Sequence, residues 1–510
     1  MAAGLRHNVF SSILYRRTVC LVGFRCASTQ QESTTLDAKD PIPFNELPHK
    51  KGYPLVGNFF EVVQSIHTLH ILIRDRHEML GPIFREKTGP FDMVCINDVV
   101  ALEQLLRQDG QYPNRNDIPA WMQYRIDAGE AYGVLIAKDE DWARMRRVLN
   151  RRMLNIKHVE KYVPDFNEVS RDFLDRLEHV RTEDNRITGL DTELFHWALE
   201  SVSTLLYSRR MGCLSENPDP ELKSFIEAVH HMFHTTANVM FFPPWFVKIF
   251  LPRRWNDFKS TFDTLFRVAR KCVDEKVEML KEEEGDKEAG FLEYILSQST
   301  LTPLEIYANV AELMAGSVDT TSNVVQMILY ELSRNPHVQQ KLYDEVTGVV
   351  PEGEFPCAAQ LQNMPYLKAV IKETLRLYPI GNSINRLLQK DMTILGYHIP
   401  AKKTVTASLY VLGRLPSLYD DPESFHPERW LRGNLKEQDK MNRFAFLPFG
   451  HGLRMCIGRR VAELEMQVLI AQMVARYCIE PVTMDPVVLK TALLLLPSEP
   501  MNVRLIDRKS

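Results

Sequence analysis

A glycine-rich loop near the C-terminus carries a single cysteine to the start of an expected helix. The segment Phe449–Gly458 reads Phe-Gly-His-Gly-Leu-Arg-Met-Cys-Ile-Gly, and a helical pattern follows from Arg459. Backbone N–H groups and the dipole at a helix N-terminus favour a thiolate over a thiol. The three glycines let a flat ligand approach closely, and Arg454 can pair with an anionic group on that ligand. The alternative for a lone cysteine such as Cys456 is a buried apolar side chain.

A second candidate site lies in the middle of a long expected helix. Thr302–Glu305 combines a capping box with proline at the first helical position, and Asn335–Pro336 is a stop signal. The ~30 residues between them would span about 45 Å. The centre of this helix, Ala315–Ser322, is a cluster of poor helix formers that includes Asp319 and Thr320. Such a centre indicates either a functional site or a buried kink that threonine side chains satisfy.

Two further pairs of residues are spaced so that an acid or an aromatic ring meets an arginine on one helical face. Glu373 and Arg376 are three positions apart, and Arg429 follows further along the chain. Trp142 and Arg146 are four positions apart. Taken alone, the Glu–Arg pair is a common solvated contact of little weight, and surface packing is the preferred interpretation of the Trp–Arg pair.

The cysteine loop resembles the haem-binding loop of cytochrome P-450 enzymes, Phe-x-x-Gly-x-Arg-x-Cys-x-Gly, at every defining position. The resemblance implies a haem b cofactor whose iron is axially ligated by Cys456. In such enzymes the thiolate donates electron density that favours cleavage of dioxygen. Five further residues are implied to contact the haem, at its propionates or beside the sulfur: Trp142, Arg146, Arg386, Phe449 and Arg454.

The Glu–Arg pair also acquires an expected role from the resemblance. Glu373, Arg376 and Arg429 stand upstream of the cysteine loop in the order of the family's buried Glu–Arg–Arg triad. That triad is structural, because it holds the segment that carries the cysteine. Loss of one member would leave an uncompensated buried charge, at a cost of roughly 3–5 kcal/mol.

The centre of the long helix resembles the family's oxygen-activation segment. In Gly316–Thr321 the resemblance implies that Asp319 and Thr320 are the catalytic acid–alcohol pair that delivers protons during oxygen activation. The usual second glycine is Ser317 in this chain, a departure that also occurs in mitochondrial steroid hydroxylases. The long helix is therefore expected to line the oxygen-binding side of the haem.

Basic residues close to the triad and the cysteine loop point to an electron donor. Lys368 and Lys372 project from one helical face, and Arg459–Arg460 follow the cysteine loop. A solvated face is the alternative. Mitochondrial members of the family use two such lysines to dock an acidic, adrenodoxin-like [2Fe–2S] ferredoxin, which an NADPH-dependent ferredoxin reductase supplies with electrons. Such redox encounters are transient and steered by charge.

The elements that must position these residues are mainly helical. The 510-residue chain has 45% hydrophobic and 25% charged residues, which is ordinary globular composition. Its net charge of −4 gives no indication of a nucleic-acid partner. Eight scattered cysteines without a Cys-x-x-Cys pair argue against a disulfide framework and favour a reducing compartment. Four short strands are expected, at Ile83–Glu86, Met93–Ile96, Thr393–Ile399 and Thr404–Ser408. The expected fold class is mainly α with small β sheets in a single large domain. The resemblance implies that this is the cytochrome P-450 fold around a buried haem.

The N-terminus differs in composition from the rest of the chain. Residues 1–31 contain several arginines and serines and no acidic residue, which is typical of a mitochondrial transit peptide. A secretory signal or membrane anchor is the alternative, but Arg16 and Arg17 interrupt its apolar core. Residues 32–58 are a Pro/Gly-rich lead-in, and residues 59–510 form the expected catalytic domain. We expect localisation at the mitochondrial inner membrane, on the matrix side.

The substrate is expected to be a lipophilic small molecule. Tyr112–Arg115, Leu375–Pro379 and Gly458–Glu465 resemble animal mitochondrial members of the family that act on steroids, sterols and vitamin D. By family position three stretches should line an apolar pocket: Ile118–Met122, Ile380–Ile384 and Ala492–Leu496. The apolar, aromatic segment Met240–Leu251 is either core or a loop in peripheral contact with the inner membrane.

Three alternative functions remain open from the sequence. The first is a haem-thiolate isomerase or dehydratase that needs no external electron donor, and the presence of both Asp319 and Thr320 argues against it. The second is a monooxygenase that oxidises xenobiotics. The third is a non-catalytic haem or sterol carrier, which would need no proton delivery.

Overall fold

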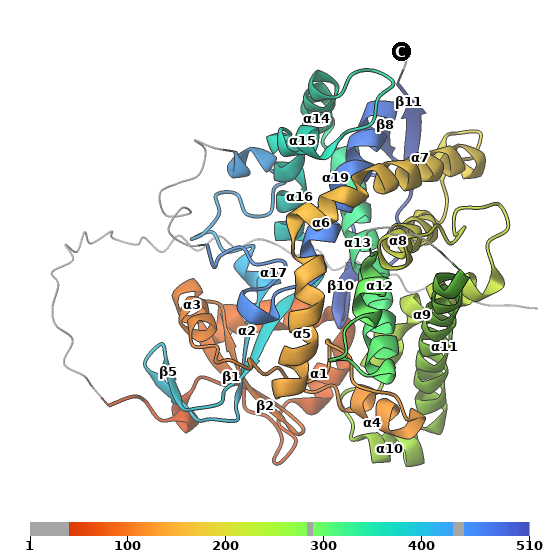
Figure 1. Ribbon diagram of the computed structural model, residues 1–510. Helices are drawn as coiled ribbons and strands as arrows, with labels where there is room; N and C mark the ends of the chain where they lie inside the picture. Colours follow the sequence, from red (N-terminus) through yellow and green to blue (C-terminus); the bar gives the residue numbers. More distant parts are fainter. Residues whose placement is uncertain (1–39, 283–288, 432–442, 509–510) are drawn as a thin grey trace, which may run out of the picture. The chain divides into compact units, whose positions relative to one another are not determined.

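The computed structural model describes residues 40–282, 289–431 and 443–508 (Figure 1). The chain divides into a short unit, Met1–Pro41, and a compact unit, Ile42–Ser510. The expected transit peptide, residues 1–31, lies outside the described residues. Within the expected lead-in, residues 40–58 carry a single 3-10 turn, Phe44–Glu46, and the first α-helix begins at Phe59.

The compact unit is mainly helical with small sheets, as the sequence predicts. Its helices are α1 (Phe59–Gln64), α2 (Leu69–Leu80), α3 (Val99–Arg107), α4 (Pro119–Ala128), α5 (Asp139–Met153), α6 (Ile156–Val159), α7 (Val163–Val180), α8 (Leu190–Tyr207), α9 (Pro220–Ala237), α10 (Pro244–Phe250), α11 (Pro252–Glu282), α12 (Phe291–Leu296), α13 (Pro303–Arg334), α14 (Pro336–Val349), α15 (Ala358–Gln362), α16 (Pro365–Leu377), α17 (Leu409–Leu412) and α19 (Arg459–Arg476). Four further short 3-10 helices are η2 (Ile66–Thr68), η3 (Glu160–Tyr162), η4 (Pro427–Trp430) and η5 (Gly452–Arg454).

The strands form small, mostly antiparallel sheets. They are β1 (Ile83–Thr88), β2 (Phe91–Ile96), β3 (Arg186–Ile187), β4 (Ser383–Leu387), β5 (Met392–Ile394), β6 (Tyr397–Ile399), β7 (Thr404–Ser408), β8 (Tyr477–Pro481), β9 (Leu489–Ala492), β10 (Leu494–Pro497) and β11 (Val503–Asp507). The largest sheet has the order β1-β2-β7-β4, in which only β2 and β7 are parallel. A second sheet has the order β3-β11-β8, and β5–β6 and β9–β10 are hairpins.

Three of the four predicted strands are confirmed, and the fourth is wrong in one respect. The predicted strand Thr393–Ile399 is a hairpin of β5 and β6 that turns at Leu395 and Gly396. Both turn residues have positive φ, 48° and 85°. A leucine rarely adopts this conformation, so the turn gave no signal in the sequence.

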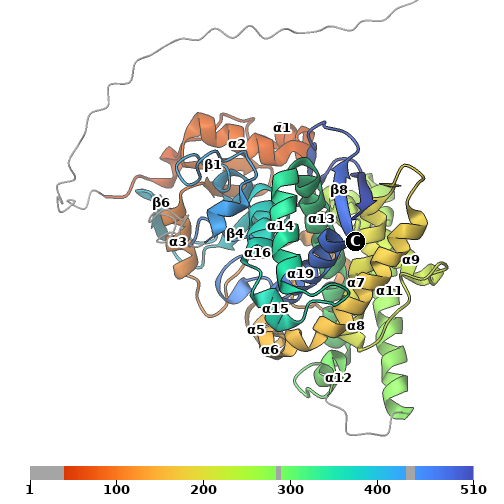
Figure 2. The same ribbon diagram turned by 90° about the horizontal axis from the view of Figure 1, so that it is seen from above.

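The long predicted helix is confirmed as α13, which starts and ends as its capping signals indicate. Thr302 Oγ1 accepts a hydrogen bond from the Glu305 N–H at 3.3 Å, and the Thr302 N–H donates to Glu305 Oε2 at 2.9 Å. Most of its 32 residues are buried. It packs against α8 and α11 on one side and against α16 and α19 on the other (Figures 1 and 2). The centre of this helix, Ala315–Ser322, therefore lies in the middle of the helical core.

The apolar core has two main parts. The larger part lies among the helices around α13. The smaller part lies between the four-stranded sheet and α3, and includes Val94, Leu102 and Val405. Across residues 40–282, 289–431 and 443–508, no helix combines the length and the apolar character needed to cross a membrane.

Candidate functional site

The cysteine loop is a tight turn between η5 and α19. The Cys456 N–H donates to the Phe449 carbonyl at 2.7 Å, which closes the loop. Gly450 and Gly452 have φ values of 71° and 69°, in the left-handed region that favours glycine. A Cβ added at Gly458 would lie 4.0 Å from Cys456 Sγ. The loop thus presents the sulfur at the first turn of α19, as the sequence predicts.

Two opposing influences act on the thiol. Burial is the largest influence and raises the pKa of Cys456 above its ordinary value. The Gly458 and Arg459 backbone N–H groups, together with Arg146 and Arg115, act in the opposite direction and favour the thiolate. The predicted influence of the helix N-terminus is therefore present. A bound metal ion deprotonates a coordinating thiol outright.

The thiol faces a space inside the protein. Cys456 and Arg115 both keep solvent-accessible area, yet burial is the largest influence on the pKa of each. Both side chains therefore lie deep, beside an internal hollow. On α13, Gly316 is also accessible although most of that helix is buried, and a Cβ added there would meet no atom within 4 Å. The glycine therefore leaves open space beside the centre of α13.

Four arginines next to the thiol form a cluster that is short of negative charge. Burial, together with the neighbouring guanidinium groups, lowers the pKa of Arg454 to about 9. Burial also lowers the pKa of Arg115 and of Arg146 to about 10. Arg386 binds the Asp109 carboxylate through two hydrogen bonds of 2.7 and 2.8 Å. Among the described residues only Asp109 forms an ion pair with one of these four arginines, and Asp139 acts on Arg454 electrostatically. This excess of positive charge fits a ligand that brings further anionic groups, such as the two propionates of a haem.

The contacts of these arginines fix their positions around the cysteine loop. The Arg454 guanidinium lies 3.8 Å from the centroid of the Trp142 ring, and both side chains are buried. Arg146 donates to the Met455 carbonyl at 2.5 Å, and its buried Nε has no partner within the described chain. Arg115 donates to the Arg454 carbonyl at 2.5 Å. The surface-contact alternative for Trp142 and Arg146 is therefore wrong.

Arg115 is a site residue that sequence reasoning missed. It lies in an irregular segment before α4, so neither helical spacing nor a short motif identified it. The only sequence signal for this arginine was the resemblance of Tyr112–Arg115 to animal mitochondrial members of the family. That resemblance assigned no role to the arginine.

The predicted Glu–Arg–Arg triad comes together around one buried carboxylate. Glu373 accepts hydrogen bonds from Arg376 at 2.7 and 2.9 Å and from Arg429 at 2.9 Å. It also accepts from the Trp430 indole at 2.8 Å and the His426 backbone at 2.9 Å. Although burial alone would raise it, Arg376 and Arg429 hold the pKa of Glu373 below its ordinary value. Trp430 is a further member that the sequence did not reveal.

The acid–alcohol pair lies at the centre of α13. The Thr320 hydroxyl is half-buried and donates to the Gly316 carbonyl at 2.7 Å. Asp319 is 1% exposed, its Oδ1 accepts from Asn323 at 3.1 Å, and its Oδ2 has no partner among the described residues. Burial raises the pKa of Asp319 to about 7, while Asn323 and Lys490 act in the opposite direction. A carboxyl that titrates near neutral pH is suited to proton transfer.

The predicted docking residues share one face but are not equally available. Lys372 is exposed, whereas Lys368 is half-buried and donates to a backbone carbonyl at 2.9 Å. Arg459 and Arg460 both pair with Glu463, at 2.9 and 3.4 Å. Glu463 on α19 also acts electrostatically on Lys368 on α16, and the two helices are in contact. Lys372 is the least compensated of the four cations.

Two of the predicted pocket-lining stretches are joined by the structure. Ile118–Met122 spans the start of α4, Ile380–Ile384 leads into β4, and Ala492–Leu496 forms the β9–β10 turn. The Leu495 N–H donates to the Ile380 carbonyl at 2.9 Å. The turn of this hairpin therefore lies against the segment that follows α16.

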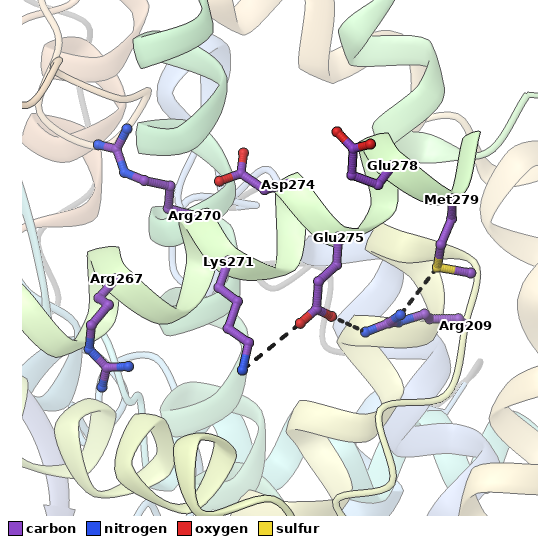
Figure 3. A pocket seen from close by; sticks show the side chains of 8 residues that line it. All are labelled: Arg209, Arg267, Arg270, Lys271, Asp274, Glu275, Glu278 and Met279. Carbon is purple, nitrogen blue, oxygen red and sulfur yellow. Dashed lines mark hydrogen bonds and ion pairs between the residues drawn. The ribbon is translucent and has the colours of Figure 1, made fainter. Parts of the chain in front are cut away.

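A separate pocket of about 700 Å³ lies along α11 (Figure 3). Its lining residues are Arg209, Arg267, Arg270, Lys271, Asp274, Glu275, Glu278 and Met279. Their charges largely compensate one another, since Glu275 pairs with Arg209 at 2.7 Å and with Lys271 at 3.9 Å. None of the residues predicted to do chemistry lines this pocket, so it is not the candidate site.

Comparisons with known proteins agree with this geometry. The cytochrome P-450 family model matches residues 47–505. The chain is 35% identical over 464 residues to mitochondrial 1,25-dihydroxyvitamin D(3) 24-hydroxylase of Mus musculus, a match that covers 91% of this chain and 89% of the relative. It is 33% identical to mitochondrial sterol 26-hydroxylase of Homo sapiens, covering 87% and 85%. It is 34% identical to mitochondrial cholesterol side-chain cleavage enzyme of Bos taurus, covering 92% and 91%.

Replacement of the Glu373 carboxylate, at the centre of the Glu–Arg–Arg triad, should release the loop that carries the cysteine. We expect Glu373→Gln to leave Arg376 and Arg429 without a charged partner, at a cost of roughly 3–5 kcal/mol. The purified variant should contain little haem and should be cleaved rapidly by protease between α16 and α19. Glu103→Gln, which breaks an exposed i,i+4 pair with Arg107, is the control and should retain haem. Normal haem content in both variants would show that the carboxylate is dispensable.

Proposed function

Because the chain belongs to the cytochrome P-450 family, we propose that it is a mitochondrial monooxygenase that hydroxylates a steroid- or sterol-like substrate. The family makes it a haem-dependent oxidoreductase with a cysteine thiolate ligand. The observation that carries the proposal is the buried arginine cluster beside Cys456, which needs an anionic partner. Dioxygen and electrons from a [2Fe–2S] ferredoxin complete the proposed reaction.

The residues at the site fit a haem in their chemistry. Cys456 supplies the ligand, Phe449 precedes the turn that holds it, and the arginines supply partners for the propionates. The residues proposed to hold the cofactor are Arg115, Trp142, Arg146, Arg386, Phe449, Arg454 and Cys456. When bound, the haem supplies the one-electron and dioxygen chemistry that inserts an oxygen atom into a C–H bond. The protein positions the substrate and supplies protons.

Proton delivery is the proposed role of the acid–alcohol pair. Asp319 is buried and titrates near neutral pH, so it can both hold and release a proton under cellular conditions. Thr320 follows it on the helix and presents its hydroxyl to the Gly316 side of α13, where the helix is accessible. An isomerase or a carrier would have no use for such a pair.

The substrate class is inferred from the pocket walls and from the relatives. Two of the proposed lining stretches, Ile118–Met122 and Ala492–Leu496, are apolar throughout, which suits a large lipophilic molecule. The names of the relatives specify a dihydroxyvitamin D, a sterol and cholesterol as their substrates. A steroid- or sterol-like molecule is therefore the proposed substrate, and its site of hydroxylation depends on contacts that apolar walls do not specify.

An exposed aromatic surface supports peripheral association with the inner membrane. Trp245, Ile249 and Phe250 on α10 are 60%, 65% and 60% exposed. The aromatic cluster continues to α1, where Phe59 packs against Phe242 with ring centroids 5.6 Å apart. Such a surface suits the boundary between lipid headgroups and acyl chains. The Met240–Leu251 segment is thus proposed to contact the matrix side of the membrane.

Spectra and cofactor requirements together test the proposed function. The reduced protein with carbon monoxide should show the Soret band of thiolate-ligated haem. Hydroxylated product should then form from a sterol only when NADPH, ferredoxin and ferredoxin reductase are all present. A histidine-type Soret band would overturn the proposal. Conversion of substrate without NADPH would favour the isomerase, and preferential turnover of drug-like compounds would favour a xenobiotic role.

The pH dependence of Asp319 provides a second test. Between pH 3.8 and about 7 the folded protein holds a proton that the unfolded chain has lost, so this carboxyl lowers stability as the pH rises. Asp319→Asn cannot titrate and should gain stability relative to wild type as the pH rises from 5 to 8. The same variant should form product at least roughly tenfold more slowly, because a general acid is lost.

Denaturant unfolding at each pH measures this difference, and Asp141→Asn on the exposed start of α5 is the control. A stability difference that stays constant with pH would show that Asp319 does not titrate in this range.

Lys372 provides the test of the docking face, because it is the least compensated of the four predicted docking cations. We expect Lys372→Glu to raise the ferredoxin KM about tenfold or more, since it converts an attraction into a repulsion at a charge-steered interface. Substrate-induced spectral shifts should not change. Lys259→Glu, at an exposed lysine on α11, is the matched control. Identical reduction kinetics in the two variants would remove Lys372 from the docking face.

A further inference from the structure

The β9–β10 hairpin carries one of the stretches proposed to line the substrate pocket. Thr491 and Leu495 are paired directly across its two strands. Beyond this pair lies the tip, Ala492–Leu494, which turns at Leu493 with a φ of 61°. Leu493 and Leu494 are half-buried and pack against the larger part of the apolar core, among the helices around α13. The tip therefore lies against the helical core.

The hairpin is held on both strands at the level of the Thr491–Leu495 pair. On β10, the Leu495 N–H donates to the Ile380 carbonyl at 2.9 Å. On β9, Thr491 Oγ1 lies 2.8 Å from His70 Nδ1 and accepts from the His70 backbone N–H at 3.4 Å. His70 belongs to α2, so the hairpin is fixed between that helix and the segment that follows α16.

The imidazole of His70 is itself held in position. His70 and Thr491 are 4% and 5% exposed, so water has little access to their hydrogen bond. The imidazole packs edge-on against the Tyr410 ring of α17, with centroids 4.9 Å and planes 80° apart. The Arg414 guanidinium lies 3.9 Å from the centroid of the same Tyr410 ring. A side chain that packing locks in this way can serve as a rigid support.

The two side chains match each other in hydrogen-bonding capacity. Burial, together with Arg414 and Arg74, lowers the pKa of His70 to about 4, so the imidazole is neutral at cellular pH. A neutral imidazole has one nitrogen that accepts a hydrogen bond, and a hydroxyl that accepts the backbone N–H still has its hydrogen to donate. Loss of one partner would leave a buried polar group unpaired, which costs more than the bond itself contributes.

We propose that His70 and Thr491 anchor the β9–β10 hairpin and thereby position the pocket wall against which the substrate is held. His70 is a positioning residue, since it acts through the hairpin and not on the substrate. A displaced tip would change which carbon of a large apolar substrate lies nearest the haem. This inference rests on the proposed function, in which Ala492–Leu496 lines the pocket, and adds what holds that wall in place.

The test uses the haem-loaded enzyme with matched substitutions at Thr491. Thr491→Val keeps the shape of the side chain and removes the hydroxyl, whereas Thr491→Ser keeps the hydroxyl. His70→Phe removes the same bond from the other side and keeps a ring against Tyr410. Thr204→Val is the control, at a buried threonine on α8 whose hydroxyl donates to the Glu200 carbonyl of its own helix at 2.9 Å.

The first readout is hydrogen–deuterium exchange of the backbone amides of β9 and β10. We expect exchange at least about threefold faster in Thr491→Val and His70→Phe than in the wild type, because loss of the hydrogen bond eases local opening of the hairpin. Thr491→Ser and Thr204→Val should exchange at the wild-type rate.

The second readout compares the dissociation constants of two azoles that ligate haem iron, imidazole and the much bulkier clotrimazole, from their spectral shifts. Clotrimazole should bind at least about threefold more weakly to Thr491→Val and His70→Phe, because its bulk meets the pocket wall. Imidazole, which is too small to fill the pocket, should bind equally well to all variants. The distribution of hydroxylated products formed from cholesterol should change in the same two variants.

The possible failures are distinguishable. Wild-type exchange rates in both Thr491→Val and His70→Phe would show that the pair does not anchor the hairpin. Faster exchange with an unchanged ratio of the two azole dissociation constants would overturn the inference as well, since the pair would then stabilise the hairpin without positioning the pocket wall. If the wild type hydroxylates no sterol, the proposed substrate class is wrong, whereas exchange and azole binding still decide the role of His70 and Thr491.

Discussion

The carboxylate of Glu373 ties helix α16 to the irregular segment that leads toward Cys456. Between α17 and η5 the described chain contains little regular structure, so backbone hydrogen bonds within helices or sheets do not position it. Arg376 bonds to the carboxylate and also to three backbone carbonyls of this segment, at 2.6 to 3.0 Å. The position of the sulfur relative to α13 therefore depends on a few charge-assisted hydrogen bonds that are shielded from water.

Without a ligand, the buried arginines of the site lack enough negative charge to balance them. The arginines beside the sulfur carry more positive charge than Asp109 neutralises, and burial of the thiol opposes the nearby amides and arginines that favour its anion. A ligand that brings carboxylates and a metal ion offsets both costs together, because the carboxylates pair with the arginines and the metal ionises the sulfur. Cofactor binding and stability of this region are consequently coupled.

The sequence revealed the parts of the site that depend on local signals. The cysteine loop, the ends of α13 and the triad are encoded by residues close together or by recognisable motifs, and the structure places them as expected. Arg115 and Trp430 were not found, because their importance comes from neighbours distant in the chain. The opposing influence of burial on Cys456 was missed for the same reason. A helix N-terminus is visible in a sequence, whereas burial is a property of the folded chain. At Leu395 the turn was missed because leucine is a poor indicator of a positive φ.

The hydroxyl of Thr320 has a single hydrogen, which in the resting protein is shared with the carbonyl one turn earlier on its own helix. It can serve another acceptor only by rotating about one side-chain bond and leaving the Gly316 oxygen free for a water molecule. The hydroxyl can therefore donate its hydrogen in more than one direction. Such rotations take picoseconds to nanoseconds at accessible sites, far faster than typical turnover. In the proposed reaction, rotation of Thr320 therefore does not limit the rate.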